Sequence, residues 1–142
     1  MAKRVLVPVD GSEQARRACE FVIDECPDAE VVLLHVINPA EAGYSAGASV
    51  PTFSEEWYDR ARANAENLFD EVEELTAETD VTTVREVEVG KPVQTIVEYA
   101  EEEAVDQVVM GSHGRSGVTR VLLGSVAESV VRRSPVPVTV VR

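Results

Sequence analysis

The chain has 142 residues, enough for one domain with a substantial core and too few for two ordinary ones. Hydrophobic residues make up 44% and charged residues 27%, a globular composition that argues against a disordered chain. With 26 acidic and 13 basic residues the formal net charge is −13, which repels nucleic acids and anionic membranes. No apolar run is long enough for a membrane helix and no signal-peptide core is visible, so the expected location is the cytoplasm.

The first part of the chain is predicted to alternate between strand and helix. A Val-rich run over residues 3–9 predicts a buried strand, and Ser12 is suited to cap the helix that follows. A second strand is expected over residues 30–37, and a Gly/Ala/Ser-rich loop over residues 38–51. Thr52 then stands in capping-box spacing ahead of a long helix.

The same alternation continues to the end of the sequence. A strand exposed on one side is predicted over residues 81–89, and Pro92 is suited to the first position of the next helix. Another strand is expected over residues 106–110, followed by a glycine-rich turn, a last helix and a fifth strand over residues 136–141. Alternating elements of this kind predict a single α/β domain over residues 1–142, with a doubly wound parallel sheet and helices on both faces. Ligands of such sheets bind beyond the carboxyl ends of the strands.

Two stretches near the carboxyl end of the chain have the composition of a phosphate site. Gly111, Gly114 and Gly117 follow the fourth strand, and glycines so placed let backbone N–H groups converge on an anion. Gly124 interrupts what hydrophobicity alone would make one helix, so we expect the last helix to begin at Ser125. Its N-terminal amides would then face the glycine loop and complete the site.

The charge distribution agrees with an anion site in this region. Residues 107–142 contain one acidic residue and five arginines, whereas the rest of the chain is strongly acidic. Arg115, inside the glycine loop, is a candidate for phosphate or nucleotide contact, the alternative being a solvated surface side chain. Asp10, at the tip of the first strand, is suited to accept from ribose hydroxyls, the alternative being a simple turn former.

The whole chain resembles the universal stress protein family. The resemblance is carried by Pro8-Val9-Asp10-Gly11-Ser12, by Leu34-His35-Val36, by Gly90-Lys91-Pro92 and by the two glycine stretches. Gly111, Gly114, Gly124 and Ser125 match the glycine spacing that marks the ATP-binding members of the family without a gap.

The resemblance implies a fold, a ligand and an assembly. The fold would be a Rossmann-like, adenine nucleotide alpha-hydrolase-like sheet of order 3-2-1-4-5, and the cofactor would be ATP, with Mg²⁺. Val9 and Val36 would line the adenine pocket, and Asp10 would lie at the ribose. The phosphates would be held by backbone and hydroxyl groups of five residues: Gly111, Gly114, Gly124, Ser125 and Val126. The family commonly forms homodimers through its last strand, and here the run from Val136 to Val141 is apolar, with Pro137 confining it to a sheet edge.

No catalytic motif accompanies the predicted nucleotide site. A Walker A lysine and a nucleophile elbow are absent from the sequence, and neither His35 nor His113 has metal-ligand spacing. His35 is expected to be a core histidine with a satisfied hydrogen bond. The sequence favours a stress-response module that binds ATP. A slow ATP hydrolase or phosphotransferase and a nucleotide-free dimeric scaffold are the alternatives.

The excess of acidic residues and the scarcity of lysine suggest a hypothesis about the salt concentration in which the protein works. Lys3 and Lys91 are the only lysines, and the other basic residues are arginine. Such a surface is typical of proteins that work in concentrated salt, where screening removes the repulsion between carboxylates.

Overall fold

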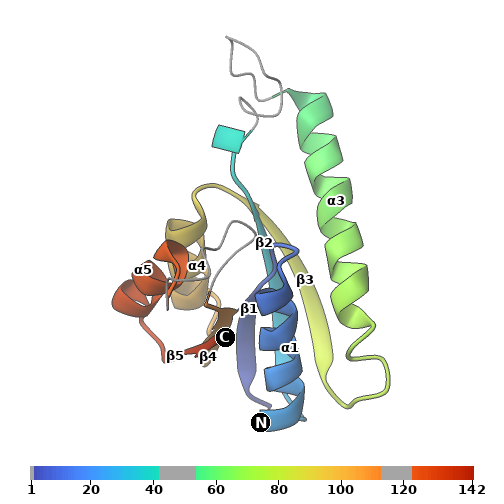
Figure 1. The fold of residues 1–142 in the computed structure, drawn as a ribbon, viewed down its shortest axis with the longest axis vertical. Helices are drawn as coiled ribbons and strands as arrows, with labels where there is room; N and C mark the ends of the chain where they lie inside the picture. Colours follow the sequence, from blue (N-terminus) through green and yellow to red (C-terminus); the bar gives the residue numbers. More distant parts are fainter. Residues whose placement is uncertain (1, 42–53, 113–122) are drawn as a thin grey trace.

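The computed structural model describes residues 2–41, 54–112 and 123–142 of the chain. The elements in chain order are β1 (Arg4–Pro8), α1 (Glu13–Glu25), β2 (Glu30–Ile37), α3 (Glu55–Glu73), β3 (Thr82–Val89), α4 (Pro92–Glu102), β4 (Gln107–Gly111), α5 (Ser125–Arg133) and β5 (Val138–Val141). Figure 1 shows these elements along the chain.

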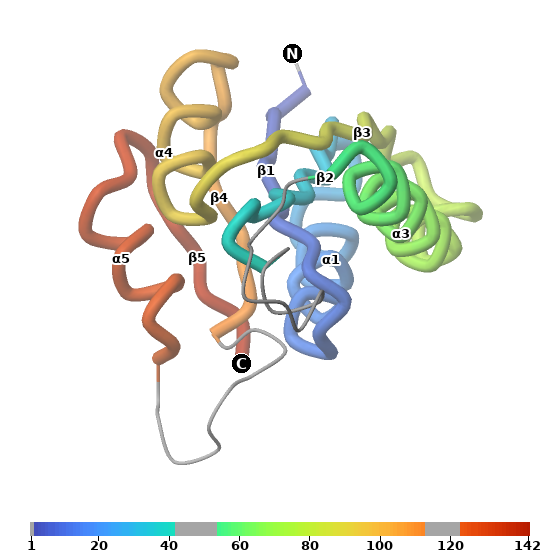
Figure 2. Tube along the Cα trace, turned by 90° about the horizontal axis from the view of Figure 1, so that it is seen from above, coloured from blue at the N-terminus to red at the C-terminus, as the bar shows by residue number. Residues whose placement is uncertain are grey.

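The strands form one parallel sheet of order β3-β2-β1-β4-β5, which confirms the predicted fold. The strand order reverses between β1 and β4, because the chain first builds outward through β2 and β3 and then returns to the other side of β1. Figure 2 shows α1 and α3 on one face of the sheet and α4 and α5 on the other. The carboxyl ends of β1 and β4 are therefore neighbours at the point where such sheets bind ligands.

The core consists of two layers, one on each face of the sheet. Successive strand residues alternate between the layers, as the period of two requires. The layer under α1 and α3 includes Val5, Val7, Ala18, Cys19, Val22, Val31, Leu33, Ala65, Phe69 and Val72. The layer under α4 and α5 includes Leu6, Val32, Leu34, Ile96, Tyr99, Ala100, Val108, Met110, Ala127 and Val130.

Several local predictions differ from the structure in detail. Ser54, and not Thr52, caps α3, and its hydroxyl accepts from the Trp57 amide at 3.0 Å, whereas Thr52 lies outside the described residues. Ala104, which follows the end of α4, is exposed and has φ 54°. Most of the predicted loop over residues 38–51 also lies outside the described residues.

No helix within the described ranges is both long and apolar enough to cross a membrane.

Candidate functional site

The turn after β1 is held by a short series of hydrogen bonds. The Asp10 carboxylate accepts from the Ser12 amide at 2.9 Å, and the Ser12 hydroxyl accepts from the Ala15 amide at 3.1 Å. Gly11 between them has φ 84°, a conformation that favours glycine. Ser12 is therefore the cap of α1, as predicted. Asp10 forms the turn with one oxygen, and its contact with a ribose stays a prediction.

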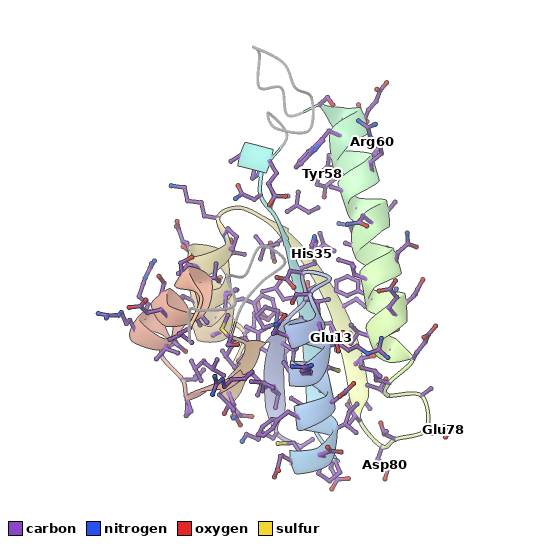
Figure 3. The ribbon with its side chains drawn as sticks, viewed as in Figure 1. Glu13, His35, Tyr58, Arg60, Glu78 and Asp80 are labelled. Atoms are coloured by element: carbon purple, nitrogen blue, oxygen red, sulfur yellow. The ribbon has the colours of Figure 1, made fainter. Side chains whose placement is uncertain are left out.

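His35 supports the start of the same turn from the neighbouring strand. Its Nδ1 lies 2.7 Å from the carbonyl oxygen of Val9. Because a carbonyl oxygen can only accept, Nδ1 carries the hydrogen and donates it. The hydrogen bond is as expected for this histidine, but the residue is only half-buried and does not belong to the core. Figure 3 labels it on β2, above Glu13 at the start of α1.

Gly111 ends β4 and lies against the first turn of α1. A Cβ atom at this position would come within 2.6 Å of the Gln14 Cβ and 2.8 Å of the Gln14 carbonyl carbon. The close approach gives this glycine a packing role that the sequence analysis missed. It also brings the carboxyl end of β4 directly beside the helix that follows β1.

Within the described residues, a hydrogen bond joins the two glycine stretches. The Gly124 amide donates to the Ser112 carbonyl at 2.6 Å, and the Ser112 amide donates to the Val141 carbonyl at 2.8 Å. Ser112 is 2% exposed, so the residue that accepts the bond from Gly124 is buried. The start of α5 is thus fixed to the carboxyl end of β4, as the prediction of one shared site required.

Helix α5 begins at Ser125, as predicted, but Gly124 and not Ser125 is its N-cap. The first helical hydrogen bond runs from the Glu128 amide to the Gly124 carbonyl at 2.9 Å. The amides of Ser125, Val126 and Ala127 precede that bond and have no partner within the helix. Since glycine has no side chain to cap them, these donors suit an anion, and the positive end of the helix dipole favours one.

Val9 follows the end of β1 and Val36 lies in the neighbouring strand β2, and these two predicted adenine residues pack on opposite faces of the sheet. Val9 belongs to the layer under α1 and α3, whereas Val36 packs against the layer under α4 and α5. Both lie at the carboxyl edge of the sheet, and their contact with adenine stays a prediction. Gly114, Arg115 and His113 lie outside the described residues.

A hollow beside the Asp10 turn was not anticipated from the sequence. It lies between the start of α1 and the last turns of α3, and its lining mixes apolar, hydroxyl and charged side chains: Val9, Gly11, Ser12, Glu13, Ala15, Arg16, Leu68, Glu71 and Val72. The lining comes from two elements far apart in sequence, and so no local motif reveals it. Among the residues that the structure describes, no three His, Cys, Asp or Glu side chains are arranged to hold a metal ion.

Known proteins with this sequence pattern share the whole architecture. The model of the universal stress protein family matches residues 1–142. Universal stress protein MJ0577 of Methanocaldococcus jannaschii is 34% identical, with the match covering 100% of this chain and 96% of that protein. The solved structure of MJ0577 superimposes with a TM-score of 0.84 over 99% of this chain and 96% of that one.

Two further solved structures extend the comparison. Universal stress protein UspA from Lactobacillus plantarum is 26% identical, with a TM-score of 0.82 over 99% of this chain and 97% of that chain. A universal stress protein in complex with cAMP is also 26% identical, with a TM-score of 0.67 over the same shares of the two chains. Because the family model and a relative more than 30% identical both span the whole sequence, this chain belongs to the universal stress protein family.

Proposed function

We propose that this protein is a stress-response module that binds an adenine nucleotide, with ATP and Mg²⁺ as the specific ligand. The observation that carries the proposal is the bond between Gly124 and Ser112, which fixes the N-terminus of α5 to the carboxyl end of β4. Family membership and the cAMP complex of a relative support an adenine nucleotide as the ligand class.

The phosphates would occupy the cup formed by the two glycine stretches. Gly111 and Gly124 would contribute backbone close to the ligand, and Ser125 and Val126 would contribute amides from the first turn of α5. Ser125 would add a hydroxyl donor. Gly114 and Arg115, which lie between the two stretches in the sequence, would also contact the phosphates. Such amides bind phosphate well, since they are donors without helical partners at the positive end of a helix dipole.

The nucleoside would lie along the carboxyl edge toward β1 and β2. Asp10 has one carboxylate oxygen in the turn, and its other oxygen is available for a ribose hydroxyl. Val9 and Val36 would offer apolar contacts to the base at this edge. Mg²⁺ would be held mainly by the phosphates, because this ion is commonly bound through substrate phosphates and only one or two carboxylates.

Mass analysis of acid-extracted protein, followed by calorimetry with Mg-ATP, tests the proposal. Gly124→Val should abolish binding, since its branched side chain would stand where the phosphates approach. His113→Ala should retain binding and serves as the matched loop control. Full affinity in Gly124→Val, or no adenine nucleotide binding in the wild type, would refute the proposed site. Following ATP for hours in the same samples tells a binding module from a slow hydrolase.

We also propose a homodimer through β5. This strand lies at one edge of the sheet, and its side chains are only half-buried within one chain. The Pro137 carbonyl accepts from Val108 of β4 and the Val141 carbonyl from Ser112 just after it, so the alternation of a strand points the amides of Val138 and Val140 outward. Val140→Pro removes an outward donor without touching the bonds to β4, and it should shift light-scattering mass from dimer to monomer. Monomeric wild-type protein would refute the dimer.

A further inference from the structure

We propose that His35 is a positioning residue for the nucleotide site, because its ring determines how the chain leaves β1 and where Asp10 lies. This inference rests on the proposed function and adds a residue to it. The histidine is not expected to touch the ligand.

Val9 is the point at which β1 passes into the turn. The strand ends at Pro8, and the Val9 amide still donates to the Leu34 carbonyl of β2 at 2.8 Å. The Val9 carbonyl accepts from the His35 ring at 2.7 Å. Both polar groups of this peptide segment are therefore held by β2, one through its backbone and one through a side chain.

The ring itself has little freedom. His35 lies within β2, and its backbone is in register with Val87 of β3. The imidazole is half-buried at the carboxyl edge. A donor mounted on a central strand of the sheet fixes the Val9 carbonyl more firmly than a donor on a surface loop would.

Asp10 directly follows Val9, so the orientation of the Val9 carbonyl affects the position of Asp10. The Asp10 carboxylate accepts from the Ser12 amide, and Ser12 caps α1. On its other side, the first turn of α1 is bounded by Gly111 at the end of β4. The turn therefore lies between His35 of β2 and Gly111 of β4. If the bond to His35 is lost, the Val9 amide still donates to Leu34 and the first turn of α1 still lies against Gly111, but the Val9 carbonyl is no longer fixed and Asp10 can move away from its position at the edge.

The test compares two substitutions of similar size. His35→Asn keeps an N–H donor at the place of Nδ1, whereas His35→Leu keeps the bulk and removes the donor. We expect the Kd for Mg-ATP to rise about fivefold to tenfold in His35→Leu, the equivalent of one lost hydrogen bond. His35→Asn should stay within about threefold of the wild type. Equal affinities in the two variants would overturn the inference.

A double-mutant cycle links the effect to Asp10. In an Asp10→Ala background, His35→Leu should cause no further loss of affinity, because the group that it positions is already gone. Losses that simply add would mean that His35 acts on stability or on another part of the site. Should His35→Leu fail to fold in urea titrations, His35→Gln replaces it, since its donor extends one atom too far.

Amide hydrogen exchange separates this inference from the proposed function. His35→Leu should speed exchange of the Ser12 amide relative to core amides, and His35→Asn should restore its protection. If the wild type binds no adenine nucleotide, the proposed function fails, and exchange at Ser12 still decides whether His35 holds the turn. Unchanged exchange in both variants would overturn the positioning role itself.

Discussion

The amide of Gly124 donates to the carbonyl of Ser112 across 2.6 Å, and this single bond joins the two ends of the glycine-rich loop. It places the uncapped first turn of α5 beside the end of β4. Gly124 has φ −69° and ψ 161°, values open to any residue, so its conformation does not require glycine. The proposed nucleotide site would explain a glycine here, because without a side chain the cap leaves the first amides of α5 to the phosphates.

Gly124→Asp should stabilise the helix and weaken nucleotide binding. An aspartate at the N-cap would accept from the first amides of α5 and complement the dipole. We expect the free energy of unfolding to rise by about 0.5 kcal/mol and the Kd for Mg-ATP to rise tenfold or more. Urea titration and calorimetry measure the two effects.

Gly124→Asn is the matched control for charge. It caps the same amides without adding a negative charge, so its affinity should lie between that of the wild type and Gly124→Asp. Tight Mg-ATP binding by the aspartate variant would mean that these amides do not hold phosphate.

Gly111→Ala should destabilise the protein even without ligand. The new Cβ would lie 2.6 Å from the Gln14 Cβ and 2.8 Å from a backbone atom, so α1 or β4 must shift. The expected cost is about 1–3 kcal/mol, typical of overpacking. Gly90→Ala is the control, since its Cβ would meet only the Thr95 hydroxyl, at 2.7 Å, which can rotate away. Equal losses in urea unfolding would show that the contact with α1 is not special.

Much of the fold could be predicted because it depends on short-range patterns. The apolar run at residues 30–37 coincides with β2, and Pro92 begins α4 as its fixed φ suggests. The sequence analysis did not identify the aromatic residues Phe69 and Tyr99, which the structure buries in the core. Which side of a helix faces the sheet is decided by tertiary packing.

The site was less predictable than the fold for a similar reason. The glycine spacing indicated that Gly111 and Gly124 belong together, but the bond that joins the two stretches involves Ser112, which no motif singled out. The packing of Gly111 on Gln14 and the bond from His35 to Val9 both link residues on different elements. Such contacts depend on the positions of strands in the sheet, and one sequence does not encode them locally.

Acid should weaken the attachment of α3 to β3 through Glu73. Arg85 of β3 donates to Glu66, Asp70 and Glu73 of α3, and Thr83 donates to Glu73 at 2.8 Å. The Arg85 hydrogen bond, helped by Thr83, lowers the pKa of Glu73 below its ordinary 4.5 despite partial burial. This contribution to stability is present above the unfolded-state pKa and is lost as the pH falls through the lower folded-state pKa.

Glu73→Gln tests that contribution by urea titration from pH 7 to pH 3. The variant should be less stable at pH 7, by about 1 kcal/mol, and should lose less of its stability on acidification than the wild type. Parallel pH profiles for the two proteins would contradict the assignment.

The two cysteines should react with thiol reagents at very different rates. Cys19 of α1 is fully buried against the sheet, and burial raises the pKa of its thiol to about 11. Cys26, which caps the end of α1, is half-buried and free. Because the thiolate is the reactive form, we expect one fast thiol per native chain and two in denaturant. Cys26→Ser should remove the fast phase, and a fast phase that survives would contradict the buried position of Cys19.

Salt should stabilise this protein, because 26 acidic side chains are balanced by only 13 basic ones. The Debye length falls from about 10 Å at 0.1 M salt to about 3 Å at 1 M, which suppresses repulsion between exposed carboxylates. We expect the Tm to rise between 0.1 and 2 M KCl. Glu101 and Glu102 are exposed in the last turn of α4, where the helix dipole disfavours negative charge.

Replacing Glu101 and Glu102 by glutamine isolates the electrostatic part of the expected rise of Tm with KCl. The double variant Glu101→Gln/Glu102→Gln should have a higher Tm than the wild type in dilute buffer and a smaller rise on adding KCl, because part of the repulsion is already gone. Differential scanning calorimetry over the salt series measures both quantities. A wild-type Tm that does not change with KCl would contradict the hypothesis of a salt-adapted surface. An equal rise in the two proteins would instead point to preferential exclusion of the salt, which acts on the surface as a whole and not on these charges.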